Sequence, residues 1–226
     1  MGALGYAKKA LVSVMMLLGF FATMVIIGIA VYLVTGARKV GGLGLWAILY
    51  SLILAKKVGV ELRAGSVSLA FIALGLGFVI PFSFVGWSLT DPLKVVGIIL
   101  GALGEELLFR GLIQGYLGDN LRAIILASVL FSSSHAFQSS SPLYLLNIFI
   151  AGIALGLWKV MGKGLLAPTA LHAGWNLALM HLNSFEEFEG SFEGLLASSA
   201  ILVLTLLIKI TSSREPLYPR GSSPSS

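Results

Sequence analysis

Two adjacent glutamates and an arginine lie in the middle of an apolar run, where charged side chains are rare. Glu105 and Glu106 are followed by Arg110 within the run Leu93–Leu117. A charge near the centre of a bilayer costs about 2.5–3.5 kcal/mol on insertion scales, so three together indicate a function. On a helix, Glu106 and Arg110 lie one turn apart in the favourable order for an ion pair. Glu105 points about 100° away from Glu106 and has no such partner, so it could act as a general base towards water.

Two histidines and an asparagine lie in later apolar runs. His135 is near the end of one run, and His172 and Asn176 are four residues apart in another, so they share a helix face. Polar side chains in a membrane normally face the interior of the helix bundle. We therefore expect these residues to meet Glu105 around one water-filled cavity. Neutral His and Asn could donate hydrogen bonds to an oxyanion, each worth about 10²–10³ in rate.

Other kinds of hydrolytic site are excluded by the residues present. The chain has no cysteine, which excludes cysteine nucleophiles and thiolate metal ligands. It contains neither a His-Glu-x-x-His zinc motif nor a Gly-x-Ser-x-Gly elbow. Asp91 and Asp119 fall between apolar runs, which does not support an aspartate dyad within the membrane. Among membrane hydrolases, a glutamate-centred site remains.

The composition indicates what must position these residues. Of the 226 residues, 57% are hydrophobic and only 11% are charged, and the mean hydropathy is +0.96. Soluble domains carry about 25% charged residues, so a membrane protein is the class that fits. We predict an all-α, polytopic transmembrane helical bundle of about eight spans. The predicted segments are Ala10–Val34, Val40–Ala55, Ser66–Leu89, Leu93–Leu117, Ala123–Phe137, Leu143–Met161, Leu165–Leu182 and Leu195–Ile210.

The basic residues support this arrangement. With eight spans and a cytoplasmic N-terminus, 11 of the 15 Lys and Arg fall on the cytoplasmic side, and three fall outside: Arg38, Lys39 and Lys94. The net charge of +5 therefore indicates membrane topology and not a nucleic-acid partner. We predict a multi-pass protein of the cell membrane with both termini in the cytoplasm. The run Ala10–Val34 is too long for a signal peptide, so we expect it to be retained.

The chain is predicted to form one domain. We assign residues 1–212 to a single transmembrane domain, with the motif-bearing core at 91–182. The segment 213–226 is rich in Ser and Pro, which predicts a disordered tail. Within it, Leu217–Ser222 is similar to an engineered protease-cleavage site, which favours an origin in cloning.

Taken together, the three polar groups resemble the motifs of the CPBP intramembrane protease family, which includes the type II CAAX prenyl endopeptidases and Abi-like proteins. The family's Glu-Glu-x-x-x-Arg motif occurs as Glu105–Arg110, its Phe-x-x-x-His motif as Phe131–His135, and its His-x-x-x-Asn motif as His172–Asn176. Each motif alone is weak, but the three in this order on three predicted membrane helices are specific.

The resemblance implies an intramembrane endopeptidase that cuts a peptide bond near the membrane. Glu105 with His135 would activate the attacking water, and His172 with Asn176 would form the oxyanion hole. The ion pair of Glu106 and its arginine would brace the site. The substrate would be a peptide or the prenylated C-terminus of a protein, reached from the lipid bilayer.

The residues alone leave two points undecided, the dependence on a metal and the class of function. Glu105, His135 and His172 could instead ligate Zn²⁺ with an open fourth position, which would make the protein a metalloprotease. We favour no cofactor, because no local ligand pair has the usual zinc spacing. The same buried charges would also suit a proton- or solute-coupled transporter, or a non-catalytic membrane scaffold.

Overall fold

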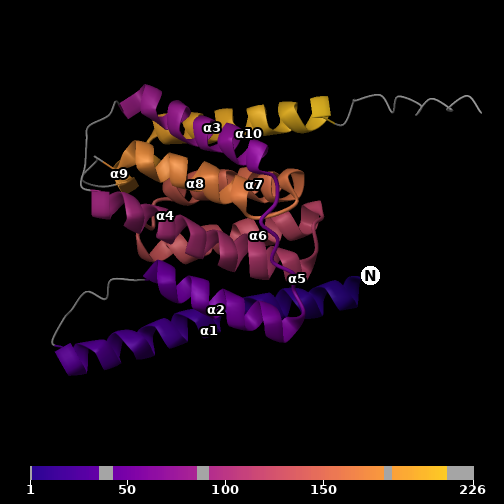
Figure 1. Ribbon diagram of the computed structural model, residues 1–226, viewed down its shortest axis with the longest axis vertical. Helices are drawn as coiled ribbons and strands as arrows, with labels where there is room; N and C mark the ends of the chain where they lie inside the picture. The colour runs from indigo at the N-terminus through magenta and orange to yellow at the C-terminus, as the bar shows by residue number, and fades with distance from the viewer. Residues whose placement is uncertain (1, 36–42, 86–91, 181–184, 213–226) are drawn as a thin grey trace, which may run out of the picture.

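The computed structural model describes residues 2–35, 43–85, 92–180 and 185–212, in which every regular element is a helix (Figure 1). The tail at 213–226 lies outside the described residues, as do Arg38, Lys39 and Asp91. The helices are α1 (Ala3–Thr35), α2 (Leu43–Val58), α3 (Val67–Val85), α4 (Pro92–Glu106), η1 (Leu107–Gln114), α5 (Gly115–Leu117), α6 (Leu121–Ser134), η2 (His135–Phe137), α7 (Pro142–Gly162), α8 (Leu166–Leu179), α9 (Phe185–Glu189) and α10 (Phe192–Ser212).

The predicted all-α helical bundle is confirmed. The described part of each of the eight apolar runs is mainly helical, and the run Leu93–Leu117 is formed by α4, η1 and α5, which follow one another without a gap. Helices satisfy their own backbone hydrogen bonds, which apolar surroundings require. By length and composition, four of the described helices could each cross a membrane: α1, α3, α7 and α10. The bundle is therefore that of a membrane protein, and the count of about eight spans stays a prediction.

Local signals in the sequence set the boundaries of the helices that carry the polar residues. The side chain of Asn120 accepts a hydrogen bond from the amide of Ala123 and so caps the start of α6. Helix α7 begins with Ser141 as its cap and Pro142 in its first turn, a position where proline fits without loss of a hydrogen bond. It ends at Lys163, which has a left-handed backbone with φ of 53°.

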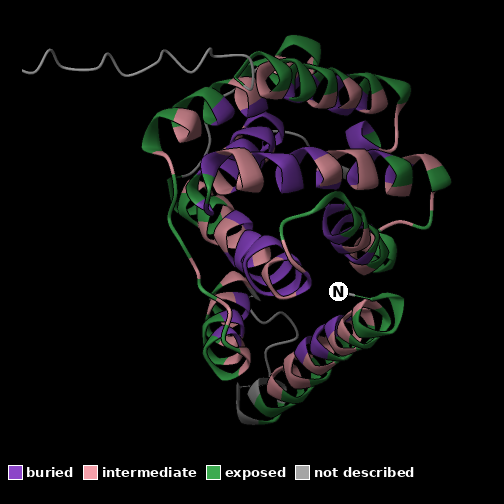
Figure 2. Ribbon diagram, turned by 90° about the vertical axis from the view of Figure 1, so that its right-hand side faces the viewer, coloured by how far each residue is buried: buried purple, intermediate pink, exposed green. Residues whose placement is uncertain are grey.

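The most tightly packed part of the bundle lies between its outer helices. In Figure 1, α4, α6, α7 and α8 lie between the pair α1 and α2 on one side and the pair α3 and α10 on the other. Buried residues concentrate in this middle part, as Figure 2 shows. Fully buried large side chains there include Leu108, Leu112, Tyr144 and Trp158. The polar residues of the predicted site are thus placed on well-packed helices.

Helix α8 packs against α3 with the two backbones in contact. A Cβ atom added to Gly77 of α3 would lie 2.1 Å from the carbonyl oxygen of Leu171. Likewise, a Cβ added to Gly174 of α8 would lie 2.6 Å from the carbonyl oxygen of Leu74. Small residues allow such close approach of helices in lipid. This contact fixes the position of α8, which carries His172 and Asn176.

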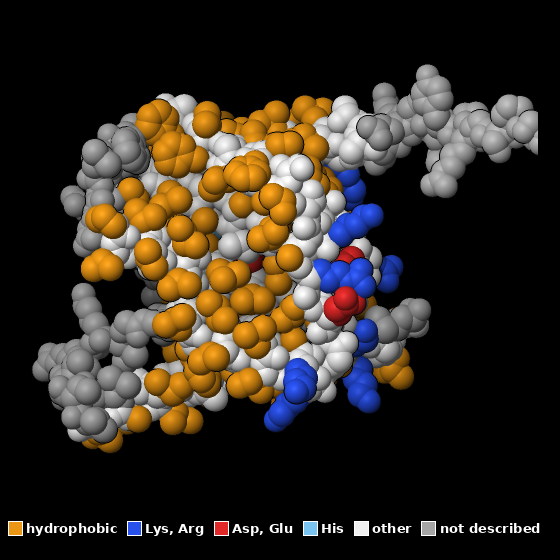
Figure 3. All heavy atoms as spheres, viewed as in Figure 1, with side chains coloured by type: hydrophobic (Ala, Val, Ile, Leu, Met, Phe, Trp, Pro, Cys, Tyr) orange, Lys and Arg blue, Asp and Glu red, His pale blue; other side chains and the backbone are white. Residues whose placement is uncertain are grey.

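The surface has an apolar belt and a charged edge. Large hydrophobic side chains such as Leu18, Ile26 and Phe71 are more than 60% exposed, which suits lipid and not water. Figure 3 shows that the basic and acidic side chains of this face gather at one edge of the bundle. Lys9 and Lys159 line a cavity together with residues of the segment between α2 and α3. This clustering is consistent with the predicted placement of the basic residues on one membrane side.

Candidate active site

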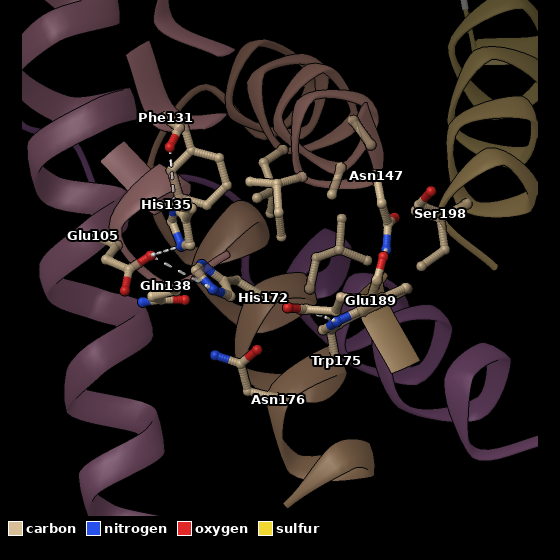
Figure 4. A pocket seen from close by; sticks show the side chains of 16 residues that line it. Glu105, Phe131, His135, Gln138, Asn147, His172, Trp175, Asn176, Glu189 and Ser198 are labelled. Carbon is tan, nitrogen blue, oxygen red and sulfur yellow. Dashed lines mark hydrogen bonds and ion pairs between the residues drawn. The ribbon is translucent and has the colours of Figure 1, made fainter. Parts of the chain in front are cut away.

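Glu105 lies in the last turn of α4, where its carboxylate faces two histidine rings (Figure 4). Its Oε2 is 3.7 Å from Nε2 of His135 and 3.9 Å from Nε2 of His172. These distances exceed that of a direct hydrogen bond but are short enough for electrostatic attraction. The Glu105 side chain is 38% exposed, whereas its neighbour Glu106 is completely buried. Of the two glutamates, only Glu105 has a partly exposed side chain, while its Oε2 is buried and has no hydrogen-bond partner among the described residues.

His135 is held so that one ring nitrogen faces Glu105. Helix α6 ends at Ser134, and the next residue, His135, begins the short 3₁₀ turn η2. Its Nδ1 lies 2.8 Å from the carbonyl oxygen of Phe131. A carbonyl can only accept, so Nδ1 carries the proton and the neutral ring presents an unprotonated Nε2 to Glu105. The Phe131 ring also packs edge-on against the imidazole, with 4.6 Å between ring centroids.

His172 is oriented by the second glutamate. Its Nδ1 lies 2.9 Å from Oε1 of Glu106, and both groups are buried. Since the carboxylate accepts, Nδ1 donates, and Nε2 is left facing Glu105. For Nε2 to donate as well, the ring must carry both protons. The sequence predicts a neutral histidine as the donor, whereas a ring that donates to Glu106 from Nδ1 would need a second proton to donate from Nε2 as well.

Glu106 and Arg110 form the predicted ion pair. Arg110 Nε lies 3.3 Å from Glu106 Oε2, and both side chains are at most 1% exposed. Arg110 also donates through one terminal nitrogen to the carbonyl of Gly152 on α7, at 3.1 Å. Its guanidinium lies over the Phe131 ring, 4.3 Å from the centroid. The pair therefore ties together the helices that carry Glu105, His135 and His172.

The helix around this pair is a π-helix, η1, which follows directly after Glu106. Such segments are rare and occur often at functional sites. All eight of its residues are buried. Nothing in the residue spacing predicted this departure from α-helical geometry.

Asn176 lies one turn beyond His172 on α8, and Figure 4 shows both on the same side of the pocket. Glu105, His135, His172 and Asn176 all line one pocket with a volume of about 230 Å³. The structure therefore brings the four residues proposed from the sequence together. Their individual roles stay predictions.

The pocket also has polar residues that the sequence argument missed. They lie on α7, α8, α9, α10 and the turn after η2: Gln138, Asn147, Trp175, Glu189 and Ser198. Asn147 lies in the apolar run Leu143–Met161, far from the charged Lys159 near its end, a signal that could have been noticed. Glu189 lies at the end of α9 and is only 8% exposed.

The sequence leaves open a zinc site at the same residues. Among the residues that the structure describes, no three His, Cys, Asp or Glu side chains form a group that could hold a metal ion. The set proposed for zinc was Glu105, His135 and His172. Since these side chains do not form a ready metal site, we derive no catalytic step through a metal.

Comparison with known families supports the motif-based interpretation. Residues 87–178 match the family described as type II CAAX prenyl endopeptidase Rce1-like. The matched segment includes all three motifs, so the resemblance inferred from the sequence is confirmed over this segment. The family is one of proteases, which supports an enzyme that cuts peptide bonds. Comparison with curated proteins gives no match for the chain.

Proposed function

We propose that this chain, whose residues 87–178 match the type II CAAX prenyl endopeptidase family, is an intramembrane endopeptidase that uses a glutamate to activate water. The observation that carries the proposal is the position of Glu105 Oε2, which faces the Nε2 atoms of His135 and His172 at 3.7 and 3.9 Å. This carboxylate lines a pocket that is large enough for water and part of a substrate.

The geometry between Glu105 and His135 suits a water molecule. The carboxylate oxygen and the unprotonated Nε2 are both hydrogen-bond acceptors, so they do not bond to each other directly. A water on the pocket side of this pair donates a hydrogen bond to one of the two atoms, which aligns its oxygen lone pair for attack on a carbonyl carbon. Glu105 then takes a proton from that water as the new carbon–oxygen bond forms.

His172 and Asn176 are placed to stabilise the negative oxygen that this attack creates. The doubly protonated His172 ring donates from Nε2, while Nδ1 remains bound to Glu106. Two carboxylates beside the ring supply compensating negative charge. Asn176 adds an amide donor from the same face of α8. When the carbon–nitrogen bond breaks, Glu105 returns its proton to the leaving amine, so one water is consumed for each bond cut.

The substrate class follows from the family and the surroundings. The bundle presents apolar side chains to lipid, so the peptide bond reaches the pocket from the membrane or its surface. The prenylated C-terminus of a protein is the best-known substrate of the family that the chain resembles, and we propose it together with membrane peptides. We also propose that residues 1–212 act as a single transmembrane domain in the cell membrane, with both termini in the cytoplasm.

The proposal is tested with purified protein in lipid nanodiscs. A prenylated CAAX peptide and a panel of membrane peptides are incubated with it, and the products are identified by mass spectrometry. We expect cleavage by the unaltered protein and a loss of about 10²–10⁴-fold in kcat for Glu105→Gln, which keeps the shape but removes the base. The matched control is Glu193→Gln, an exposed glutamate in the first turn of α10.

Three outcomes contradict the proposal. Cleavage by Glu105→Gln at the normal rate contradicts the role of Glu105. Solute flux into proteoliposomes without peptide cleavage supports the transporter hypothesis. Full biological activity with both Glu105→Gln and His172→Gln supports a non-catalytic scaffold.

A further inference from the structure

The end of the pocket opposite Glu105 carries a buried amide with an unused acceptor. Asn147 of α7 is 1% exposed, and its Nδ2 donates to the backbone carbonyl of Glu189 at 2.9 Å. That bond fixes the orientation of the amide. In the described part of the chain, its Oδ1 has no hydrogen-bond partner. A buried acceptor without a partner is costly, and in native proteins it usually marks a bound water, an ion or a ligand.

Each of the donor side chains at this end makes a hydrogen bond within the described part of the protein. Trp175 Nε1 donates to Oε1 of Glu189 at 3.0 Å, and the Asn147 amide donates to the backbone of the same residue. The hydroxyl of Ser198 donates to the carbonyl of Leu195 at 3.1 Å, which leaves its own oxygen able to accept. A group that binds between Asn147 Oδ1 and Ser198 Oγ therefore meets two acceptor oxygens, and a donor suits this position.

The part of the pocket between the two ends is apolar. Figure 4 shows Asn147, Trp175, Glu189 and Ser198 on the side away from Glu105 and His135. The other residues that line the pocket are mostly aliphatic: Ile148, Ala151, Ala154, Leu155, Leu171 and Ile201. The volume of about 230 Å³ exceeds the roughly 150 Å³ of an engineered apolar cavity that binds benzene. One long side chain thus fits in the pocket, with its stem among aliphatic groups and its tip at Asn147.

We propose that Asn147 Oδ1 and Ser198 Oγ form a specificity subsite for a substrate side chain that has an apolar stem and ends in a hydrogen-bond donor. This rests on the proposed endopeptidase function and adds to it a rule for substrate choice. Side chains with an amide, hydroxyl or ammonium tip meet the rule. A carboxylate, including a free C-terminus, does not, because it brings only acceptors to a site of acceptors.

The test uses any peptide that the protein cuts, with each residue near the cut bond replaced in turn. At one position we expect Gln or Asn to be preferred over its apolar counterpart, Met or Leu, by about tenfold or more in kcat/KM, because the apolar residue leaves Oδ1 unpaired. Asn147→Leu removes the acceptor and should abolish this preference, so that kcat/KM for the donor peptide and for its apolar counterpart becomes about equal.

Gln114→Leu is the matched control. Gln114 is also a fully buried amide that donates to a helix carbonyl, that of Gly156, and its Oε1 also lacks a partner among the described residues. It does not line this pocket. We expect Gln114→Leu to lose stability to a similar extent but to keep the preference for donor side chains.

The subsite and the proposed function fail in different ways. If peptides are cut but no position favours a donor, or if Asn147→Leu and Gln114→Leu change the preference equally, the subsite is wrong and the endopeptidase stands. If the protein does not cut these peptides, their binding is measured instead by fluorescence polarisation. Donor-dependent binding that is lost in Asn147→Leu then supports the subsite although the endopeptidase fails, and binding without that dependence contradicts both.

Discussion

Glu106 and His172 are 66 residues apart in the chain, yet Oε1 of the one lies 2.9 Å from Nδ1 of the other inside the bundle. Glu106 thus has two partners, because its Oε2 also faces Arg110. Glu106 therefore does more than form an ion pair with Arg110. It orients the His172 ring, which we propose as an oxyanion donor, and this contact connects α4 to α8.

We predict that stability and activity respond differently when this contact is removed. Glu106→Gln leaves the buried Arg110 without a counter-charge, which should destabilise the protein by about 3–5 kcal/mol. The double variant Glu106→Gln, Arg110→Met removes both charges and should recover much of that stability. Its kcat should stay low, because His172 has lost its carboxylate. Thermal unfolding and peptide cleavage measure the two effects, and normal kcat in the double variant would show that Glu106 does not position His172.

Removal of the Asn176 amide should affect the chemical step and not substrate binding. Asn176→Ala is expected to lower kcat by about 10²–10³-fold with little change in KM, because an oxyanion donor acts mainly in the transition state. Steady-state kinetics on one peptide separates the two quantities. A rise in KM at constant kcat would instead assign Asn176 to substrate binding.

Cleavage should not depend on a metal ion. No group of three suitable side chains in the described residues forms a metal site, and the proposed chemistry uses Glu105 alone to accept the proton. We expect kcat to survive prolonged dialysis against a strong chelator, with metal content checked by mass spectrometry. Loss of activity on dialysis, with recovery at one equivalent of Zn²⁺, would revive the set Glu105, His135 and His172 as ligands.

We predict that one methyl group added at the contact between α3 and α8 destabilises the protein. In Gly77→Ala the new Cβ would lie 2.1 Å from the Leu171 carbonyl, so the helices must separate, at a cost of about 1–3 kcal/mol. Gly75→Ala is the control on the same helix, because nothing lies within 4 Å of its added Cβ. We expect a lower unfolding temperature and lower kcat for Gly77→Ala only. Equal behaviour of the two variants would contradict the tight contact.

The helices and the polar site residues could be predicted because apolar runs and isolated charges are both easy to recognise in the sequence of a membrane protein. An apolar run forms a helix in a membrane, so the described part of each of the eight runs is mainly helical. Charges such as Glu105 and Arg110 stand out against that background. Spacing along a helix also predicted the pair of Glu106 and Arg110, since residues four apart are neighbours.

Contacts between helices could not be predicted in the same way. Spacing gives no information on partners from another helix, so the bond from His172 to Glu106 was missed. The π-helix after Glu106 was missed because residue spacing assumes regular α-helical geometry. Glu189 was given no part in the predicted site, although Trp175 and Asn147 bind it in the pocket wall. These features depend on how the helices pack, which the pattern of hydrophobic residues leaves undetermined.

The buried charges have a consequence for how the protein is made. Glu105, Glu106 and Arg110 all lie on the stretch formed by α4 and η1, so this stretch alone is a poor segment for insertion into lipid. The helix that carries His172 leaves the ribosome much later and brings the partner of Glu106. We therefore expect α4 to wait in the translocon or at the lipid surface until α8 arrives. The insertion of α4 into the membrane and the assembly of the polar centre would then occur together.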